Sequence, residues 1–432
     1  MNLGLILGTA LPAIGVILIL RGVSAFQARR IAMLAVALGT LGACAALAWD
    51  IVGATVQSGT GEVPAWVITD TWKSFVPFVV GVIGMVAVAM SPIVGMRSGT
   101  FARLLLVHVT SVALVMAGDL LFIAFMWTVS LLPVWLELRS DERTKPTARV
   151  FLAYMFPSAT CVVAGVIMQA QGLAGAVVIL AFGIAIRQAV IPLHSWFVPF
   201  VESAPLGMVV AFAVPQLGVF AHLHLLTSDY GPQLGQVIAF GGAVTAVMAS
   251  VLGVVQASAR RALAYLIISQ SGLMAFGLEA TSVIARSGTL LMWVVMGLAM
   301  AGFTMAIAAL EARRGPHDIS RPNGNFSRTP MLATAFLLLG FASVGLRGTL
   351  GFVAEDLLVQ GSVSHYPIRG MSLIIATAFN GITVMRSFFA LFCGTSVHNN
   401  APGLTLREKL ALNSVLVLLV VAGLWPRLLH LL

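Results

Sequence analysis

The stretch Ala-Ile-Arg187-Gln-Ala-Val-Ile-Pro192-Leu-His194-Ser-Trp196 lies in a long apolar segment of this chain. It sets a permanent cation beside a proline in a sequence that otherwise suits hydrocarbon. A charge at bilayer depth is costly, so it needs a partner or a wet cavity. Proline lacks an N–H and clashes with the preceding turn, so the helix should kink or open near Pro192. The stretch predicts a broken membrane helix on an ion pathway; the alternative is that Arg187 reaches to an interface.

The composition is that of a protein that crosses a membrane many times. Of the 432 residues, 59% are hydrophobic and only 9% are charged, whereas a soluble domain carries about 25% charged residues. The net charge of +9 is spread over short loops, which indicates membrane topology rather than nucleic acid binding. Cys44, Cys161 and Cys393 lie in separate apolar segments, so neither a disulfide framework nor a metal site is expected.

Fourteen apolar stretches are long enough to cross the hydrocarbon core, which takes about 20 residues of helix. They are 3–21, 31–49, 75–95, 102–117, 118–137, 147–169, 173–192, 206–227, 234–255, 262–280, 286–312, 329–362, 368–394 and 409–430. The twelfth is too long for one straight helix and should be interrupted near Arg347-Gly348-Thr349-Leu350-Gly351. The sequence therefore predicts an all-α membrane protein with about 14 transmembrane helices.

The placement of basic residues supports this count. With fourteen spans, 17 of the 24 lysines and arginines fall on one face. The other face receives only Lys73, Arg286, Arg369 and Arg427. The remaining three lie inside apolar segments and are Arg187, Arg347 and Arg386. Because basic residues concentrate on the cytoplasmic side, we expect an integral protein of a bacterial inner membrane with both termini outside the cytoplasm.

The polar stretches between the spans are short. The longest are 50–74, 138–149, 312–330 and 395–408. They carry no nucleotide-binding loop and no zinc spacing. No catalytic centre, metal or cofactor is therefore expected on this chain.

A second polar place inside the apolar segments is Gly351-Phe-Val-Ala-Glu355-Asp356. Two adjacent carboxylates in a glycine-interrupted run suggest another broken helix that lines water. A glutamate in such a place is a functional-site candidate, since it can exchange a proton. The alternative is an interfacial loop between two half-helices.

Histidines and one more arginine complete the set of candidates. His194 follows the proline of the seventh segment, and His222-Leu-His224 ends the eighth. Histidine titrates near neutral pH, but residues at i and i+2 point to different sides of a helix, so both cannot line one path. His222 is thus either a proton relay or a histidine that is satisfied by its surroundings or lies at the membrane interface. Arg386 belongs either to the pathway or to a structural ion pair.

Five motifs in this order resemble a known family. They are Asp119-Leu-Leu-Phe…Met-Trp127, Arg187…Pro192-Leu-His194-Ser-Trp196, Ala204-Pro205, Arg261-Ala-Leu-Ala-Tyr265…Ser269-Gln270-Ser-Gly272 and Gly351-Phe-Val-Ala-Glu355-Asp356. The chain resembles, over about residues 100–395, the antiporter-like membrane subunits of respiratory complex I and of multi-subunit cation/proton antiporters.

The resemblance implies fourteen helices with two inverted five-helix repeats and with helices 7 and 12 broken, here at Pro192 and Gly351. Within a single membrane domain of residues 1–432, it divides the chain into helices 1–3 (1–97), repeat one with helices 4–8 (98–227), repeat two with helices 9–13 (234–394), and helix 14 (409–430). It also implies partners beside the lipid bilayer: other membrane subunits, a soluble peripheral subunit, or both.

Departures from the family pattern affect the ion pathway. The family has a glutamate after the tryptophan, paired with a lysine on the seventh helix, and these positions are Thr128 and Arg187 here. The lysine of its eighth helix is absent, since the region reads Ala213-Val-Pro215-Gln216-Leu-Gly218. Arginine does not deprotonate in proteins, so it cannot relay a proton. His222 is the nearest titratable substitute, and Glu355 matches a proton site of the family.

We therefore expect an ion-translocating subunit, with the proton as the ion, of a complex like the membrane arm of complex I or of a cation/proton antiporter. One alternative is the membrane subunit of an energy-coupled uptake complex for inorganic carbon (bicarbonate or CO2) with a soluble zinc partner. Another is a scaffold that conducts no ions. Membership of a quinone oxidoreductase or hydrogenase-like complex would be its only link to catalysis. The expected ion-pathway residues are Arg187, His194, His222, Glu355, Asp356 and Arg386.

Overall fold

The computed structural model describes residues 3–58, 65–93, 96–226, 231–363, 367–394 and 403–425. Within these ranges every regular element is a helix, and no β-strand forms beyond one isolated bridge. The helices are α1 (Leu3–Leu20), α2 (Ala25–Ser58), α3 (Ala65–Met90), α4 (Ser98–Val115), α5 (Leu120–Val129), α6 (Leu131–Arg139), α7 (Lys145–Ala170), α8 (Ala176–Arg187), α9 (Phe197–Ser203), α10 (Leu206–Phe212), α11 (Leu217–Leu225), α12 (Pro232–Val254), α13 (Ala259–Leu278), α14 (Val283–Arg314), α15 (Pro330–Ala342), α16 (Leu350–Val363), α17 (Pro367–Phe392) and α18 (Leu406–Leu424).

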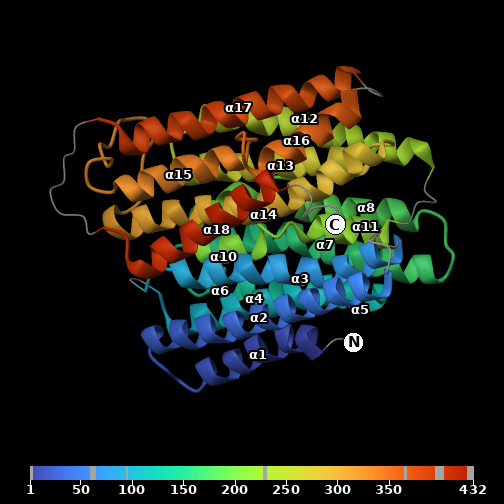
Figure 1. Ribbon diagram of the computed structural model, residues 1–432, viewed down its shortest axis with the longest axis horizontal. Coiled ribbons are helices and arrows are strands. Elements are labelled where there is room, and N and C mark those ends of the chain that lie inside the picture. The colour runs from blue at the N-terminus through green and yellow to red at the C-terminus, as the bar shows by residue number, and fades with distance from the viewer. Residues whose placement is uncertain are drawn as a thin grey trace.

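The helices lie side by side with their axes close to one direction, from α1 and α2 at one edge to α12 and α17 at the other (Figure 1). Within the described ranges, nine helical stretches are long and apolar enough to cross a membrane. Shorter apolar helices lie at Ile6–Leu20, Ser74–Met90, Ala176–Arg187 and Pro330–Ala342. A helix satisfies its own backbone hydrogen bonds, which hydrocarbon requires. The protein is therefore an integral membrane protein, as its composition predicts.

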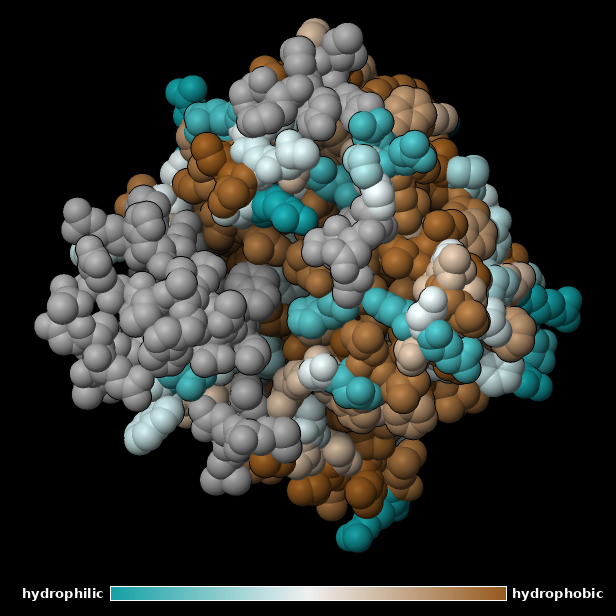
Figure 2. Space-filling model, turned by 90° about the vertical axis from the view of Figure 1, so that its right-hand side faces the viewer, coloured by the Kyte–Doolittle hydropathy of each residue, from teal (hydrophilic) through white to brown (hydrophobic). Residues whose placement is uncertain are grey.

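Apolar side chains are exposed along the flanks of the bundle. Phe156, Val237 and Leu410 are each more than half exposed. In water such a surface would mark an interaction site or cause aggregation, whereas in a bilayer hydrocarbon covers it. Figure 2 looks at one end of the bundle, where hydrophilic residues are scattered between hydrophobic ones.

Small residues let the helices approach closely. A Cβ added at Gly242 of α12 would lie 2.6 Å from the backbone nitrogen of Phe276 in α13. One added at Gly272 of α13 would lie 2.6 Å from the backbone nitrogen of Ala246 in α12. Close backbone contact at small residues is the usual packing between membrane helices, because lipid supplies no hydrophobic force to press them together.

Several apolar segments are interrupted. α8 ends at Arg187 and α9 begins at Phe197, so residues 188–196, which include Pro192, are not helical. α15 ends at Ala342 and α16 begins at Leu350. This second interruption precedes Gly351, which is itself helical and packs against the carbonyl of Ala342. Two further interruptions were not predicted from the sequence: one between α5 and α6, and one between α10 and α11, where Gln216 has a positive φ of 45°.

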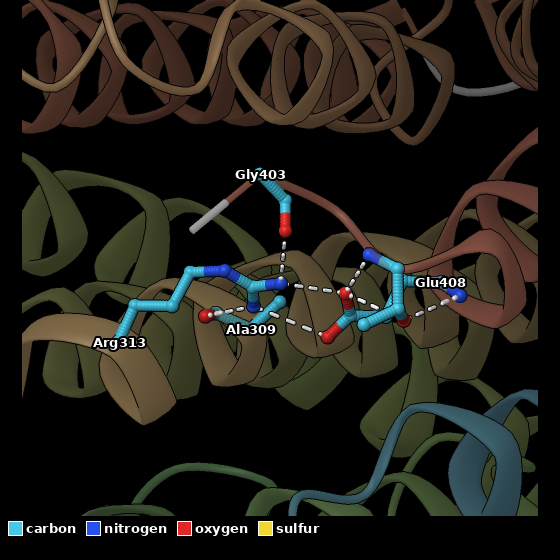
Figure 3. A network of polar contacts seen from close by, with 5 residues as sticks. Ala309, Arg313, Gly403 and Glu408 are labelled. Atoms are coloured by element: carbon cyan, nitrogen blue, oxygen red, sulfur yellow. Dashed lines mark hydrogen bonds and ion pairs between the residues drawn. The ribbon is translucent and has the colours of Figure 1, made fainter. Parts of the chain in front are cut away.

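Ion pairs at the helix ends fix these pieces to one another. Arg260 at the start of α13 pairs with Glu311 of α14 at 2.7 Å and donates to the carbonyl of Ala204 at 2.8 Å. The same guanidinium also donates to the carbonyls of Val201 and Glu202, so it satisfies carbonyls that the end of α9 leaves free. Arg313 of α14 pairs with Glu408 of α18 at 2.6 Å (Figure 3). The last part of the expected fourteenth segment, 426–430, lies outside the described residues.

Candidate functional site

Arg187, the last residue of α8, lies between two aromatic rings inside the bundle. Its guanidinium carbon is 4.3 Å from the ring centre of Trp127 in α5 and 4.6 Å from that of Phe212 in α10. Its Nη1 donates to the hydroxyl of Ser130 at 2.9 Å and to the carbonyl of Trp127 at 3.2 Å. The residue is 7% exposed, so it does not reach out to an interface. Cation–π contact is strongest when the cation is desolvated in this way.

The surroundings of Arg187 are neutral. None of the ion pairs among the described residues includes Arg187. Thr128 is exposed, and its hydroxyl donates to the carbonyl of Ala124 in its own helix. Ser130 occupies the place beside the guanidinium instead. Because arginine keeps its proton in proteins, the site contains a fixed positive charge.

A small cavity adjoins this cation. Its volume is about 20 Å³, which is enough for a water molecule. Its lining includes Arg187, Gln188, Gln216 and Phe212. The Nη2 of Arg187 and the Nε2 of Gln188 are buried and have no hydrogen-bond partner within the described part of the chain. Buried polar atoms are normally satisfied by protein or by ordered water, so the cavity is suited to water.

Helix α13 connects the two interrupted helices through adjacent residues. The hydroxyl of Ser271 donates to the carbonyl of Gln188, next to Arg187, at 2.8 Å. The side chain of Gln270 donates to the carbonyl of Ser343, the first residue after α15, at 3.0 Å. Ser271 is 1% and Gln270 is 2% exposed. A buried polar connection thus runs from one interruption, through α13, to the other.

Glu355 of α16 lies beyond the second interruption. Its carboxylate accepts a hydrogen bond from the hydroxyl of Thr377 in α17 and lies against Gly345, whose φ is +82°. Asp356 points elsewhere: it is exposed and accepts a hydrogen bond from Gln360 at 2.8 Å. The two adjacent carboxylates therefore have different surroundings, and only Glu355 is directed into the bundle.

Asn380 of α17 extends the polar connection near Glu355. Its side-chain nitrogen donates to the hydroxyl of Ser269 in α13 at 2.9 Å. Its Oδ1 and the Oε1 of Gln270 are buried without a hydrogen-bond partner in the described residues. Both are acceptors, so together with the donors at Arg187 and Gln188 they provide hydration sites on the two sides of α13.

His222 of α11 forms a buried pair that the sequence did not predict. Its Nε2 lies 2.9 Å from Oε1 of Glu279, the residue that follows α13, and the two side chains are 7% and 6% exposed. His224 lies on the other side of the helix, where it is exposed and its ring stacks on Phe220. The opposite orientations of the two histidines follow from their spacing.

The remaining candidates are not gathered at one point. His194 lies in the non-helical stretch after α8, with its ring centre 6.5 Å from that of Tyr265. Arg386 of α17 donates to the carbonyl of Gln256, near the end of α12, at 2.6 Å. Among the contacts of the described residues, none joins Arg187 directly to Glu355. The link between them is the α13 connection.

The sequence identified most of the buried charged residues but not the side chains with which they pair. Glu279 ends an apolar segment, and a carboxylate at that place is a detectable signal. Glu137 of α6 is 7% exposed and accepts from Arg103 of α4 at 2.5 Å and from Thr100 at 2.9 Å. Nothing in their spacing, 34 and 37 residues apart, indicates that these three side chains meet.

The fold and this site define a class: polytopic α-helical membrane proteins with broken helices and a buried polar connection at their centre. The family model described as NADH:quinone oxidoreductase/Mrp antiporter, TM, matches residues 160–380. This match covers half of the chain and includes both interruptions. The chain belongs to that family, as the five motifs predict.

Relatives and solved structures agree with this membership. NADH-quinone oxidoreductase subunit M of Pseudomonas aeruginosa is 26% identical over 254 residues, or 56% of this chain. The chain spans about half (49%) of that relative's length. A chain in the structure of respiratory complex I from Thermus thermophilus is similar with a TM-score of 0.85 at 20% identity, over 98% of this chain and 96% of that one. A chain of the Mrp complex from Dietzia is similar with a TM-score of 0.82 at 18% identity, over 100% and 96%.

Proposed function

We propose that this protein is an ion-translocating membrane subunit of a multi-subunit complex and that the ion is the proton. The observation that carries the proposal is the polar connection across α13, because Ser271 and Gln270 bond to the two interrupted helices that hold Arg187 and Glu355. Non-helical backbone at membrane depth is tolerated where it is buried in protein or lines a wet cavity. Ion sites of transporters are commonly built at such broken helices.

In this proposal each residue of the ion pathway has the role that its side-chain chemistry allows. Arg187 acts as a fixed positive charge that orders water in the adjoining cavity. Glu355 binds and releases the proton, with Thr377 as its hydrogen-bond donor. Waters held by Gln188, Gln270 and Asn380 carry the proton between the two regions, since a proton moves along hydrogen-bonded water without a side chain at every step. His222 with Glu279 adds a second titratable place, while His194, Asp356 and Arg386 lie at the margins of the route.

The finer architecture belongs to the same proposal. The chain crosses the membrane fourteen times, and residues 98–227 and 234–394 form two inverted five-helix repeats that place the two interruptions symmetrically. Residues 1–97 precede them as helices 1–3, and 409–430 follow as helix 14. The face with most of the basic residues is cytoplasmic, which places both termini outside the cytoplasm of a bacterial cell with the protein in its inner membrane.

The partner proteins are proposed from the complexes in which the similar solved chains occur. The similar solved chains come from a respiratory complex and an Mrp complex. Other membrane subunits are therefore the first expected partners, and a soluble peripheral subunit is the second. The lipid bilayer covers the remaining apolar flanks.

The experiment begins with gentle affinity purification from native membranes and mass spectrometry of the proteins that co-purify. Redox subunits support a pump like complex I, and further antiporter-like subunits support a cation/proton antiporter. A soluble zinc protein replaces the proposal with inorganic-carbon uptake. Purification of the chain alone contradicts the multi-subunit part of the proposal.

The purified assembly is then placed in vesicles that contain a pH-sensitive dye, and proton flux is measured under its own driving reaction. One feature favours a non-conducting scaffold: Arg187 cannot release its proton and pairs with no carboxylate of the described residues. The decisive comparison is a Glu355→Gln variant of the intact, active assembly. If its proton flux is unchanged, no flux passes through this chain, and the protein is a scaffold.

A further inference from the structure

An apolar cavity of about 270 Å³ lies between α8, α11, α12 and α13. Its walls include Ala185, Ile238, Gly241 and Ala275. It opens sideways, because the apolar residues at its rim are exposed: Val178 by 55%, Phe182 by 49% and Val237 by 66%. These three residues lie in apolar runs of α8 and α12, residues 176–186 and 237–244, so the medium at the rim is the hydrocarbon of the bilayer.

A second cavity of about 720 Å³ continues the first at the end of the bundle where α7 ends and where α8 and α12 begin. The two cavities share Val178 and Leu234. The lining of the second is mixed rather than apolar and contains Gln169 and Gln233 together with loop glycines. The Oε1 of Gln169 is buried and has no partner in the described residues. Among the described residues that line this polar mouth, none is charged.

The deep end of the apolar cavity reaches Gln188, which is 5% exposed. Gln188 also lines the small cavity beside Arg187, so its side chain forms part of the wall between the two cavities. His222, whose other side pairs with Glu279, lines the apolar cavity as well. The space is therefore elongated, apolar within, polar at the outer end and closed at Gln188.

We propose that these joined cavities bind one chain of a membrane lipid, with the acyl chain in the apolar cavity and a head group of no net charge in the polar mouth. The shape follows the amphipathic order of a lipid, and the side opening admits the chain directly from the bilayer. Pockets that bind small amphiphiles are commonly apolar with a few polar groups that fix orientation. A chain seated there keeps bulk water away from Gln188 and so seals the Arg187 cavity on that side. The binding itself does not rest on the proposed ion translocation.

The test uses photoreactive phosphatidylcholine with the whole protein in phosphatidylcholine vesicles. One probe carries a diazirine near the end of its acyl chain, and a second carries it next to the ester. After irradiation, mass spectrometry of peptides locates the labels. The chain-end probe is expected to label Gln188 and Ala275, and the ester probe the loop residues of the polar mouth. Ala275 is only 2% exposed, so lipid that merely surrounds the bundle does not reach it.

Two glycine variants provide a matched comparison. A Cβ at Gly241 has only Val190 nearby, at 3.9 Å, and one at Gly381 of α17 has nothing within 4 Å. Gly241→Leu therefore fills the cavity without a clash, whereas Gly381→Leu adds the same side chain elsewhere. We expect deep labelling to fall at least tenfold in Gly241→Leu and to stay unchanged in Gly381→Leu.

Several results would overturn the lipid site. These are equal labelling of Ala275 in both variants, labelling of the polar mouth by the chain-end probe, or no deep labelling at all. A further check is a Gly241→Cys variant in vesicles: its reaction with a membrane-impermeant charged thiol reagent would show a water-filled space and contradict the proposal. None of these readouts depends on proton flux, so failure here is distinct from failure of the proposed function.

Discussion

The interruption after α8 and the interruption before α16 hold opposite charges in contrasting surroundings. Arg187 lies between two aromatic rings, with one hydroxyl and one carbonyl as hydrogen-bond acceptors. Glu355 has a hydroxyl donor and lies against a glycine in the loop that interrupts the segment. The first site holds a charge that stays on at every ordinary pH. The second holds a group that titrates, so the two regions are suited to different tasks.

The contrast extends to what lies beside each charge. Arg187 bonds to the hydroxyl of Ser130, while the hydroxyl of Thr128, two residues before Ser130, bonds within its own helix. Glu355 has Asp356 beside it in sequence and directed away from it. In each region one residue faces the polar connection and a similar residue nearby does not. These neighbours are natural controls, because a change at each tests the same chemistry outside the connection.

The largest expected effect is at the titrating site. Glu355→Gln keeps the shape of the side chain but removes its capacity to release a proton, and a proton-transferring side chain contributes about a thousandfold in rate. We expect proton flux of the assembled complex in vesicles to fall by about that factor, with assembly unchanged on a native gel.

Asp356→Asn is the matched control for Glu355→Gln. Asp356 is exposed and bonds only to Gln360 of its own helix in the contacts of the described residues. Its replacement is expected to leave flux within twofold of the wild type. Equal losses in the two variants would remove the distinction between the carboxylates, and no loss in either would support the scaffold.

The second effect concerns the buried pair on the Arg187 side. His222→Leu removes the imidazole from Glu279, and loss of one partner from a buried pair costs about 3 kcal/mol. We expect the free energy of unfolding in detergent to fall by about this amount, as measured by circular dichroism during titration with a denaturing detergent.

His224→Leu provides the comparison two residues further along α11. Its ring is exposed and stacks on Phe220, with ring centres 3.9 Å apart. The replacement removes little buried contact, so we expect less than about 1 kcal/mol. Similar losses in both variants would mean that the His222–Glu279 pair contributes nothing specific to stability.

The charges of both regions could be predicted from the sequence, because an ionisable residue within an apolar run is conspicuous. Pro192 lies within the first interruption, and the run that contains Arg347 was too long for one helix. The family and the membrane location followed from five ordered motifs and from composition. These features are local along the chain, so reading one sequence is enough to find them.

The contacts could not be predicted, because they join residues that are distant in sequence. Ser130 and Arg187 are 57 residues apart, and Gln270 and Ser343 are 73 apart. Gln270 belongs to one of the five motifs, but nothing in that motif indicates that its amide bonds to the loop of the second interruption. Such contacts depend on how helices pack, which periodicity and composition do not specify. The interruption at Gln216 follows Pro215, a local signal of the same kind as Pro192 that was not used to predict it.

A smaller effect is expected when the fixed charge is kept but its shape is changed. Arg187→Lys retains the cation and loses the planar group that lies between Trp127 and Phe212. Stacking of a desolvated cation on aromatic rings contributes about 2 kcal/mol, so we expect a loss of stability of that size with flux within a few fold. Unfolding in detergent and flux in vesicles measure the two quantities on the same preparation.

Arg347→Lys is its control on the other interrupted segment. Arg347 is exposed, and its guanidinium carbon lies 5.6 Å from the ring centre of Phe352. An exposed contact of this kind contributes about 0.5 kcal/mol, so little stability should be lost. If Arg187→Lys abolishes flux while the fold remains stable, a fixed charge is insufficient and the shape of the guanidinium takes part in conduction.

The smallest expected effect distinguishes a hydroxyl that bonds to Arg187 from a nearby hydroxyl that does not. Ser130→Ala removes one acceptor of the Arg187 guanidinium, while the carbonyl of Trp127 at 3.2 Å remains. We expect a loss of about 1 kcal/mol in the free energy of unfolding. Thr128→Ala removes a hydroxyl whose hydrogen bond, among the described residues, goes to Ala124 of its own helix. The change should therefore have no effect or be slightly stabilising, because alanine is the better helix former. If Thr128→Ala destabilised the protein more than Ser130→Ala, the hydroxyl that stabilises the Arg187 site would be that of Thr128, at the position where the family has its glutamate. That result would contradict the role of Ser130 as an acceptor for the guanidinium.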